Sequence, residues 1–193
     1  IFVGDQTRSN LMRIVLEKVQ GAYQGAIFNF IDGLQSGVVR NQFNEQGVLY
    51  VGQTGRGWRS AGDKIFGLQT VRWDRQTTPV EMLSIGLTTR GFEIRFTQPM
   101  DVKALADASH YEIEHWHYLY RPEYGSPKAD RIKAVPERIE VTHDGMRVHC
   151  QMPQLEGKVY QFRLNGMQSR SGRPLTNPIG WYTLNKRRLS DLR

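Results

Sequence analysis

Short apolar segments recur along the chain, and polar clusters rich in glycine separate them. Residues 48–51 show the pattern best, because four apolar side chains stand between Gly47 and Gly52. β-branched and aromatic residues suit a pleated strand, and glycine allows the turns that end one. Strand-sized apolar runs outnumber helix-sized runs, so the pattern predicts an all-β protein.

The first region, residues 1–75, is expected to contain six short strands. They are predicted at residues 1–3, 11–19, 26–30, 37–43, 48–51 and 67–73. Residues 11–19 also suit a helix, but a strand is favoured because Met12, Ile14 and Leu16 would line one face while Arg13 points away. Six strands with glycine-rich turns predict the last blades of a β-propeller.

The second region, residues 80–186, is predicted to form an immunoglobulin-like β-sandwich. Strands are expected at residues 81–87, 91–96, 110–120, 138–142, 146–152, 159–164 and 181–184. Their spacing, with polar turns between them, is typical of a sandwich. One or two helical turns are expected at residues 101–108, and an irregular loop at residues 121–136. The polar residues 74–80 form the predicted linker, and residues 187–193 a basic tail.

The composition limits the classes of partner. The net charge of +7 suits an anionic partner, but part of it gathers in the last residues, Lys186, Arg187, Arg188 and Arg193. We see no recognition helix, zinc pattern or aromatic and basic strand, so nucleic-acid binding is not expected. The single cysteine, Cys150, excludes an intrachain disulfide and is expected to be buried. No apolar run reaches a membrane-spanning length, so no membrane span is predicted.

Several motifs together resemble a known group of proteins. In the first region these are residues 3–6, 19–26, 52–58 and 67–73, and in the second region residues 92–101, 124–127 and 182–185. At these spacings the chain resembles the C-terminal part of large exported planctomycete-type proteins. Their propeller is similar to quinoprotein sugar dehydrogenases of the glucose/sorbosone type. Residues 92–101 are similar to the opening of a bacterial immunoglobulin-like domain.

The resemblance implies a function for the parent protein. It implies an exported protein, secreted or periplasmic, that is linked to carbohydrate oxidation through pyrroloquinoline quinone and Ca²⁺, with haem c in a separate domain. The chain begins with Ile1 inside a predicted strand, so we interpret it as a C-terminal fragment whose partners include upstream propeller blades. The alternative is a non-catalytic β module that binds carbohydrate or protein.

Arginines in the first region are the candidate cofactor ligands. A guanidinium group can clamp the carboxylates of a quinone cofactor, and Arg40, Arg56 and Arg59 are candidates. Arg56 is the best placed, because glycines on both sides allow the backbone to approach a ligand. The alternative is that Arg56 pairs with an acid such as Asp63 and stabilises the turn.

Aromatic residues are the candidate substrate contacts. Trp58, Tyr23 and Trp116 could stack on a sugar ring, although structural packing would also explain each of them. A run of aromatic residues in the second region would form a carbohydrate platform: Trp116, Tyr118, Tyr120 and Tyr124.

Histidines suggest a metal site as a further alternative. His115 and His117 would share one face of a strand, and His110, His149 or Glu112 could supply a third ligand to copper or zinc. All five histidines lie in the second region, so the first lacks a histidine base. Asp5 could act as a base, although an aspartate in such a turn more often binds its own backbone. The fragment alone is therefore not expected to be a complete enzyme.

Overall fold

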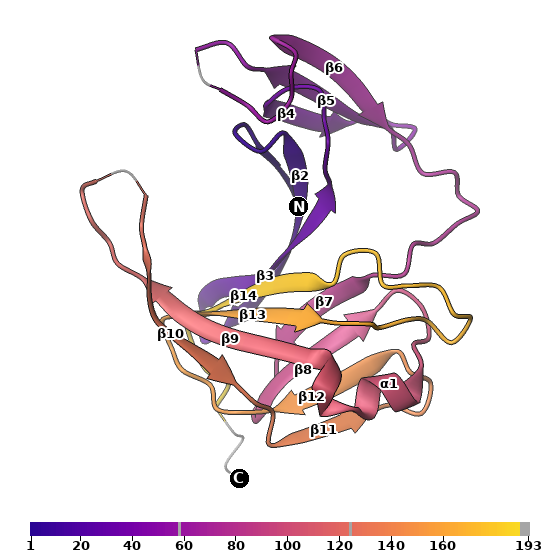
Figure 1. The fold of residues 1–193 in the computed structure, drawn as a ribbon, viewed down its shortest axis with the longest axis vertical. Coiled ribbons are helices and arrows are strands. Elements are labelled where there is room, and N and C mark those ends of the chain that lie inside the picture. Colours follow the sequence, from indigo (N-terminus) through magenta and orange to yellow (C-terminus); the bar gives the residue numbers. More distant parts are fainter. Residues whose placement is uncertain (58, 124, 190–193) are drawn as a thin grey trace. The chain divides into compact units, whose positions relative to one another are not determined.

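The computed structural model describes residues 1–57, 59–123 and 125–189. Among these residues strands account for 51% and helices for 4%, and all strand pairs belong to three antiparallel sheets. This confirms the predicted all-β fold (Figure 1). Within the described ranges, no helix has the length and apolar character that crossing a membrane requires.

The chain divides into two compact units. Unit 1 consists of Ile1–Ile14 and Ile27–Thr78, and unit 2 consists of Val15–Ala26 and the chain from Pro79 onward. The boundary after Thr78 falls inside the predicted linker. Residues 15–26, however, group with unit 2, which the sequence-based boundary of 1–75 and 80–186 did not anticipate. The reason is that two long strands run through both units and end in a hairpin that packs within unit 2.

Unit 1 is built from two sets of antiparallel strands. Its elements are β1 (Phe2–Asp5), the first part of β2 (Asn10–Val19), the second part of β3 (Ala22–Ile31), β4 (Val38–Phe43), β5 (Leu49–Thr54) and β6 (Phe66–Val71). β1 pairs with β2, and β4, β5 and β6 form a three-stranded sheet in chain order. The buried core joins the two sets: Leu11, Leu34, Val38, Leu49 and Val51.

The prediction of a strand at residues 11–19 is confirmed by β2. Its turn into β3 places Gln20 at φ 49° and Gly21 at φ 83°. Two successive positive φ values are typical of the turn that best matches the twist of a β-hairpin, and a glycine at the second position suits it. The hairpin therefore follows from the local sequence.

Unit 2 contains two sheets that face each other. One has the order β11 (Arg138–Val141), β12 (Arg147–Gln151), β8 (Gly91–Phe96) and β7 (Met82–Leu87). In the other, the hairpin end of β3 is followed by β14 (Ile179–Leu184), β13 (Lys158–Leu164), β9 (Tyr111–Tyr118) and β10 (Lys128–Ala134). A short helix α1 (Val102–Ala106) and a 3₁₀ turn η1 (Ala108–His110) follow β8, as expected for residues 101–108.

Aromatic side chains join the two sheets of unit 2. The Phe92 ring on β8 lies 4.8 Å from that of Tyr160, 5.1 Å from that of Phe162 and 5.3 Å from that of Tyr182. All four residues are fully buried. Rings at these separations and tilted orientations contribute more than their buried area alone. This cluster is the centre of the unit 2 core.

The prediction of an irregular loop at residues 121–136 is wrong for its second half. There the chain forms β10, which pairs with β9 and contains a bulge between Ala129 and Ile132. Most side chains of β10 are exposed, so this edge strand lacks the apolar alternation that would reveal it. Backbone hydrogen bonds to β9, rather than burial, hold it in place.

Candidate binding face

The glycine-rich stretch that follows β5 forms a tight connection to β6. Gly55 donates its N–H to the Ile65 carbonyl (2.7 Å), and the Arg56 N–H donates to the Thr54 hydroxyl (3.2 Å). A Cβ on Gly55 would lie 3.2 Å from the Lys64 carbonyl, closer than side chains normally approach. A larger residue would displace its neighbours by a few tenths of an ångström, so packing alone favours a glycine here.

The predicted cofactor arginines are exposed on this unit. The Arg40 guanidinium donates to its neighbour's carbonyl at Val39 (2.9 Å), and the side chains of Arg56 and Arg59 are also exposed. The alternative pairing of Arg56 with Asp63 is not the one formed, because Asp63 pairs with Lys64 (3.6 Å). Trp58 lies outside the described residues.

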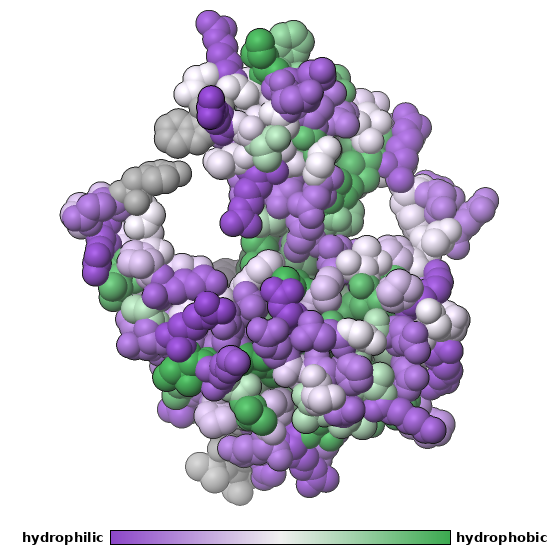
Figure 2. Space-filling view, viewed as in Figure 1, coloured by the Kyte–Doolittle hydropathy of each residue, from purple (hydrophilic) through white to green (hydrophobic). Residues whose placement is uncertain are grey.

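The outer face of the three-stranded sheet carries apolar side chains that are exposed to solvent. Register places Tyr50 opposite Thr70, Gly52 opposite Leu68, and Thr54 opposite Phe66. On this face Phe66 is 76% exposed, Leu68 69% and Tyr50 39%. We call Tyr50, Phe66 and Leu68 the apolar face. Apolar atoms are seen over the sheet that contains β6 at the top of Figure 2. Contiguous exposed apolar surface of this kind commonly marks an interaction site.

Hydrogen bonds to glutamine side chains on the inner face hold the sheet in this orientation. The Gln53 amide donates to the Gln69 side-chain oxygen (2.8 Å), and the Ser36 N–H donates to the Gln53 oxygen (2.9 Å). The Gln35 N–H also donates to Gln69 (2.9 Å). Turning the sheet over would leave these polar groups unpaired. The network therefore keeps the apolar face directed outward.

The outer edge of β6 carries backbone groups that β5 does not use. Antiparallel strands alternate between residues that bond the neighbour and residues that point away from it. Because Ile65 bonds Gly55, the residues bonded to β5 are 65, 67, 69 and 71. Phe66, Leu68 and Thr70 therefore direct their N–H and C=O groups away from β5. Within the described residues no strand lies beyond β6 in this sheet.

Two further predicted residues of the first region do not join this face. Tyr23 lies at the hairpin end that belongs to unit 2, is 66% exposed, and has the Lys18 ammonium 5.5 Å from its ring centre. Asp5 accepts a hydrogen bond from the Arg8 N–H (2.9 Å), as expected for an aspartate that binds its own turn.

The structure buries Trp116 completely. Its indole is 0% exposed, and the Lys128 ammonium lies 3.7 Å from its ring centre. A cation over an aromatic ring is favourable, and here it occupies the surface that a sugar would need. Trp116 is therefore packed as part of unit 2. Tyr118 and Tyr120 are exposed, and Tyr124 lies outside the described residues.

The two histidines of the metal-site hypothesis have separate surroundings. His115 is buried beside Tyr160, and burial lowers its pKa, with the Lys158 charge adding to the effect. His117 lies near Asp130 (3.4 Å) and accepts a hydrogen bond from Lys158 (2.9 Å). A search of the described side chains finds no group of three histidine, cysteine or acidic residues that could hold a metal ion.

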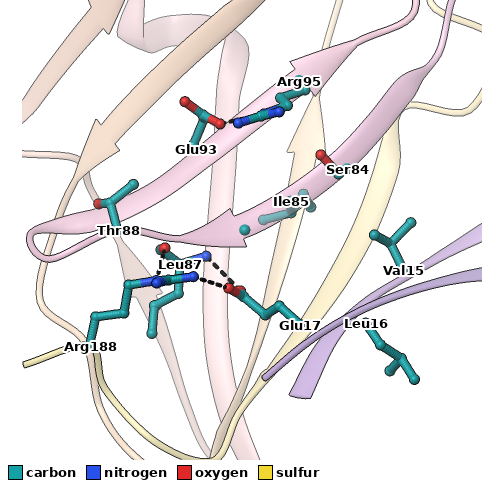
Figure 3. A pocket seen from close by; sticks show the side chains of 11 residues that line it. Val15, Leu16, Glu17, Ser84, Ile85, Leu87, Thr88, Glu93, Arg95 and Arg188 are labelled. Carbon is teal, nitrogen blue, oxygen red and sulfur yellow. Dashed lines mark hydrogen bonds and ion pairs between the residues drawn. The ribbon is translucent and has the colours of Figure 1, made fainter. Parts of the chain in front are cut away.

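A pocket of about 240 Å³ in unit 2 lies between the hairpin end and β7 and β8 (Figure 3). Glu17 accepts hydrogen bonds from the Leu87 N–H (2.7 Å), the Tyr182 hydroxyl (2.5 Å) and the Arg188 guanidinium (2.8 Å). Glu93 pairs with Arg95 (2.5 Å). The charged side chains that line this pocket, Glu17, Glu93, Arg95 and Arg188, are all paired with one another or with neighbouring groups, and these contacts stabilise the fold.

Burial has a marked effect on ionisable groups near the hairpin end. It raises the pKa of Tyr182 well above its ordinary value, and the hydrogen bond to Glu17 adds to the effect. The Tyr182 hydroxyl also accepts a bond from Gln24 (2.7 Å), so it stays protonated as a link between the hairpin and β14. These contacts show that residues 15–26 are an integral part of unit 2.

Sequence reasoning did not single out Phe66, Leu68 and Tyr50, the three residues of the apolar face. A signal was present, because residues 64, 66, 68, 70 and 72 alternate with Gly67, Gln69 and Val71. The alternation alone does not say which side faces the core. Gln53 and Gln69 would have shown which side faces the core, because their side chains bond each other on the inner face of the sheet.

Comparisons with known proteins give limited matches. The chain matches no protein-family model and no curated protein. Two solved structures align with parts of it. The "Structure of surface layer protein SbsC, domains 1-6" shares 20% identity over 58% of this chain, with a TM-score of 0.43. The "Crystal structure of the S-layer protein rSbsC" shares 20% identity over 56%, with a TM-score of 0.42. The aligned part spans 14% of each of those proteins, and neither likeness assigns the chain to a family.

Proposed function

We propose that this chain is a non-catalytic interaction module that binds protein through the apolar face of unit 1. One observation carries the proposal: Phe66 and Leu68 are 76% and 69% exposed, yet they lie on an ordered sheet whose inner side is fixed by hydrogen bonds. Leaving apolar groups in water is unfavourable, and covering them with a partner gains roughly 25 cal/mol per Å². The face therefore suits an apolar partner surface.

The surroundings of the face favour protein over carbohydrate. Sugar sites use flat aromatic rings together with several polar side chains that fix the hydroxyl groups. Here the most exposed members are one phenylalanine and one leucine, and leucine offers no ring. Of the aromatic residues predicted to form a platform in unit 2, Trp116 is buried, so the ring at the start of that run cannot stack on a sugar, although Tyr118 and Tyr120 are exposed. Protein binding is therefore the better explanation.

The wider setting that we propose comes from the sequence resemblance. In this proposal unit 2 is an immunoglobulin-like domain, residues 1–75 form the closing blades of a propeller, and the parent is an exported protein linked to sugar oxidation. Two facing antiparallel sheets around an aromatic core support the first part. The antiparallel meander of β4, β5 and β6 supports the second.

The binding proposal can be tested with peptides selected from a random library against the full chain. We expect selected peptides to lose at least tenfold in affinity when Phe66 and Leu68 are both replaced by serine. The matched control is Ile132→Ser, which removes an exposed apolar side chain from the edge strand β10 of unit 2. Peptides that bind both variants equally, or affinity for polysaccharides that depends on Phe66 and Leu68, would contradict the proposal.

The parent's chemistry needs a different assay. With pyrroloquinoline quinone, Ca²⁺ and a dye acceptor, this chain alone is expected to oxidise no sugar, whereas a longer parent chain should oxidise at least one. Sugar oxidation by the 193-residue chain would contradict the non-catalytic assignment. Inactivity of the parent across a broad sugar panel would argue against the link to oxidation.

A further inference from the structure

We infer that β6 binds its partner by strand addition, and that the partner segment is an extended peptide with apolar residues in the middle and acidic residues at both ends. The inference rests on the proposed function, because it specifies the partner of the same face. Three independent features of unit 1 support it: a free backbone edge, the apolar face beside that edge, and basic residues at both ends of β6.

The free edge determines the conformation of the partner. Phe66, Leu68 and Thr70 each present one N–H and one C=O at a spacing that matches an extended strand. A helix cannot satisfy such a row, because its own backbone groups are already paired. An added strand can, and exposed sheet edges are recognised in this way.

The side chains determine the character of the middle of the partner. An added strand continues the sheet, so alternate residues of the partner would lie beside Phe66 and Leu68 on the outer face. Tyr50 lies on the same face one strand further in, at 39% exposure. Apolar or β-branched residues at alternate positions of the partner would cover these groups. The intervening positions would project toward the opposite face, so they are less restricted.

The charges determine the ends of the partner. Lys64 lies two residues before β6 and Arg72 directly after it, both in the same alternation as Phe66 and Leu68. Both are exposed, and Arg40 adds a third cation on the outer face opposite Gly52. Each end also has an acid close by in the sequence: Asp63, which is 81% exposed and pairs with Lys64 at 3.6 Å, and Asp74, whose carboxylate accepts hydrogen bonds from the Gln76 and Thr77 N–H groups. Exposed pairs such as that of Lys64 and Asp63 are weak, so a carboxylate of the partner can replace Asp63.

The test uses the full chain and a fluorescent peptide of alternating valine and threonine with two glutamates at each end. We expect the peptide to bind, and a version with lysines at the ends to bind about threefold to tenfold more weakly. A version that carries N-methyl groups on one edge keeps its side chains but cannot pair with β6. It should lose at least tenfold in affinity. Higher salt should weaken the acidic peptide.

Variants of the protein provide the matching controls. Thr70→Pro removes an N–H that points away from β5, so it blocks strand addition while the β5 pairing is kept. It should weaken binding at least tenfold, whereas Thr70→Ala should change it less than twofold. Replacing both Lys64 and Arg72 by glutamate should reverse the preference and favour the lysine peptide. If Thr70→Pro fails to fold, the N-methyl peptide and wild-type protein give the same test.

The outcomes separate this inference from the proposed function. Equal affinity for the N-methylated and unmodified peptides, or no binding at millimolar concentration, would overturn strand addition. Library peptides that still depend on Phe66 and Leu68 would then leave the binding face itself intact. Loss of that dependence would overturn the binding face, and strand addition with it.

Discussion

The two units place their apolar side chains in opposite ways. In unit 2 the large aromatic residues Phe92, Tyr160, Phe162 and Tyr182 are fully buried between two sheets. In unit 1 a small aliphatic core lies on one side of the three-stranded sheet, and Phe66 and Leu68 remain in solvent on the other. The aromatic residues of unit 2 therefore stabilise its core, whereas unit 1 leaves two apolar side chains of its sheet exposed to solvent.

The inner polar groups differ in the same way. Unit 1 buries a neutral network of Gln53, Gln69 and Ser36, in which each bond is between uncharged groups. Unit 2 uses a carboxylate, Glu17, that accepts bonds from three separate strands or segments. Bonds that involve a charged group contribute more than neutral ones. The difference indicates that unit 2 depends strongly on a few residues, and unit 1 on many weak contacts.

The largest expected effect comes from the centre of the unit 2 core. Replacing Phe92 by alanine removes a ring that contacts three others, and we expect the free energy of unfolding of unit 2 to fall by about 3–5 kcal/mol. Hydrogen exchange followed by mass spectrometry would report each unit separately. A loss below about 1 kcal/mol would mean that Phe92 is not central to the core.

The next largest effect is expected at alkaline pH, which should lower the stability of unit 2 more than that of unit 1. Burial raises the pKa of Cys150 from 9.0 to about 12, and burial also raises the pKa of Tyr160 and Tyr182 from 10.0. Below pH 9 both folded and unfolded states keep these protons, so stability is unaffected. Above pH 9 the unfolded chain loses the cysteine proton, and above pH 10 the tyrosine protons, while the folded chain keeps them. Each group therefore lowers the stability of unit 2 by about 1.4 kcal/mol per pH unit once the pH exceeds its unfolded pKa.

The control for the alkaline prediction is Cys150→Ala. This variant should show a smaller decline between pH 9 and pH 10 than the wild-type chain, because the unfolded tyrosines ionise about one pH unit later than the cysteine. Unit 1 has no cysteine, and its tyrosine, Tyr50, is exposed. Thermal unfolding at several pH values, with hydrogen exchange to locate the change, provides the measurement. Equal loss in both units would contradict the prediction.

A smaller effect is expected at the hairpin end. Glu17→Gln removes the charge that accepts bonds from Leu87, Tyr182 and Arg188, and we expect a loss of about 1–3 kcal/mol. Amide protection should fall first in residues 15–26. The matched control is Glu140→Gln, which breaks an exposed pair with Arg138 and should cost about 0–1 kcal/mol. Similar losses in both variants would show that the Glu17 contacts are weak.

The smallest effect is expected on the apolar face. Phe66→Ala and Leu68→Ala should each change stability by less than about 0.5 kcal/mol, because both side chains are mostly in solvent. Chemical denaturation of the full chain is a sufficient measurement. A loss above about 2 kcal/mol for either variant would place that side chain in a core and would remove the basis for a free binding face.

Local patterns predicted most of the strands. The β2–β3 hairpin was predictable from its apolar runs and Gly21, and α1 from Asp101, whose side chain accepts from the N–H groups of Lys103 and Ala104. β10 was not predictable, because its exposed residues carry no apolar alternation. The assignment of residues 15–26 to unit 2 depends on Glu17 meeting Arg188, which are 171 positions apart in the sequence. No local pattern encodes such a pairing.

The candidate site was predictable only in part. Arg40 and Arg56 were singled out, and they lie exposed on unit 1, with Arg40 on the outer face itself. For Trp116 the sequence left open whether it stacks on a sugar or packs in the core. Its environment favours packing, because Lys128 covers its ring. Phe66 and Leu68 look like core residues in the sequence. They are exposed because Gln53 and Gln69 form their hydrogen bonds on the opposite, inner face of the sheet. Which face turns inward depends on tertiary contacts and is not encoded in the local sequence.

The shared hairpin also sets the order in which the protein can be completed. Residues 15–26 are made early, yet the strand that lies beside β3 in unit 2 is β14, the last strand of the chain. During synthesis the hairpin end must wait until more than 150 further residues have been added before it finds its neighbour. Unit 1 is complete long before that, since it ends at Thr78. A chain that ended before residue 179 would therefore lack β14, and the hairpin end would have no neighbouring strand in unit 2.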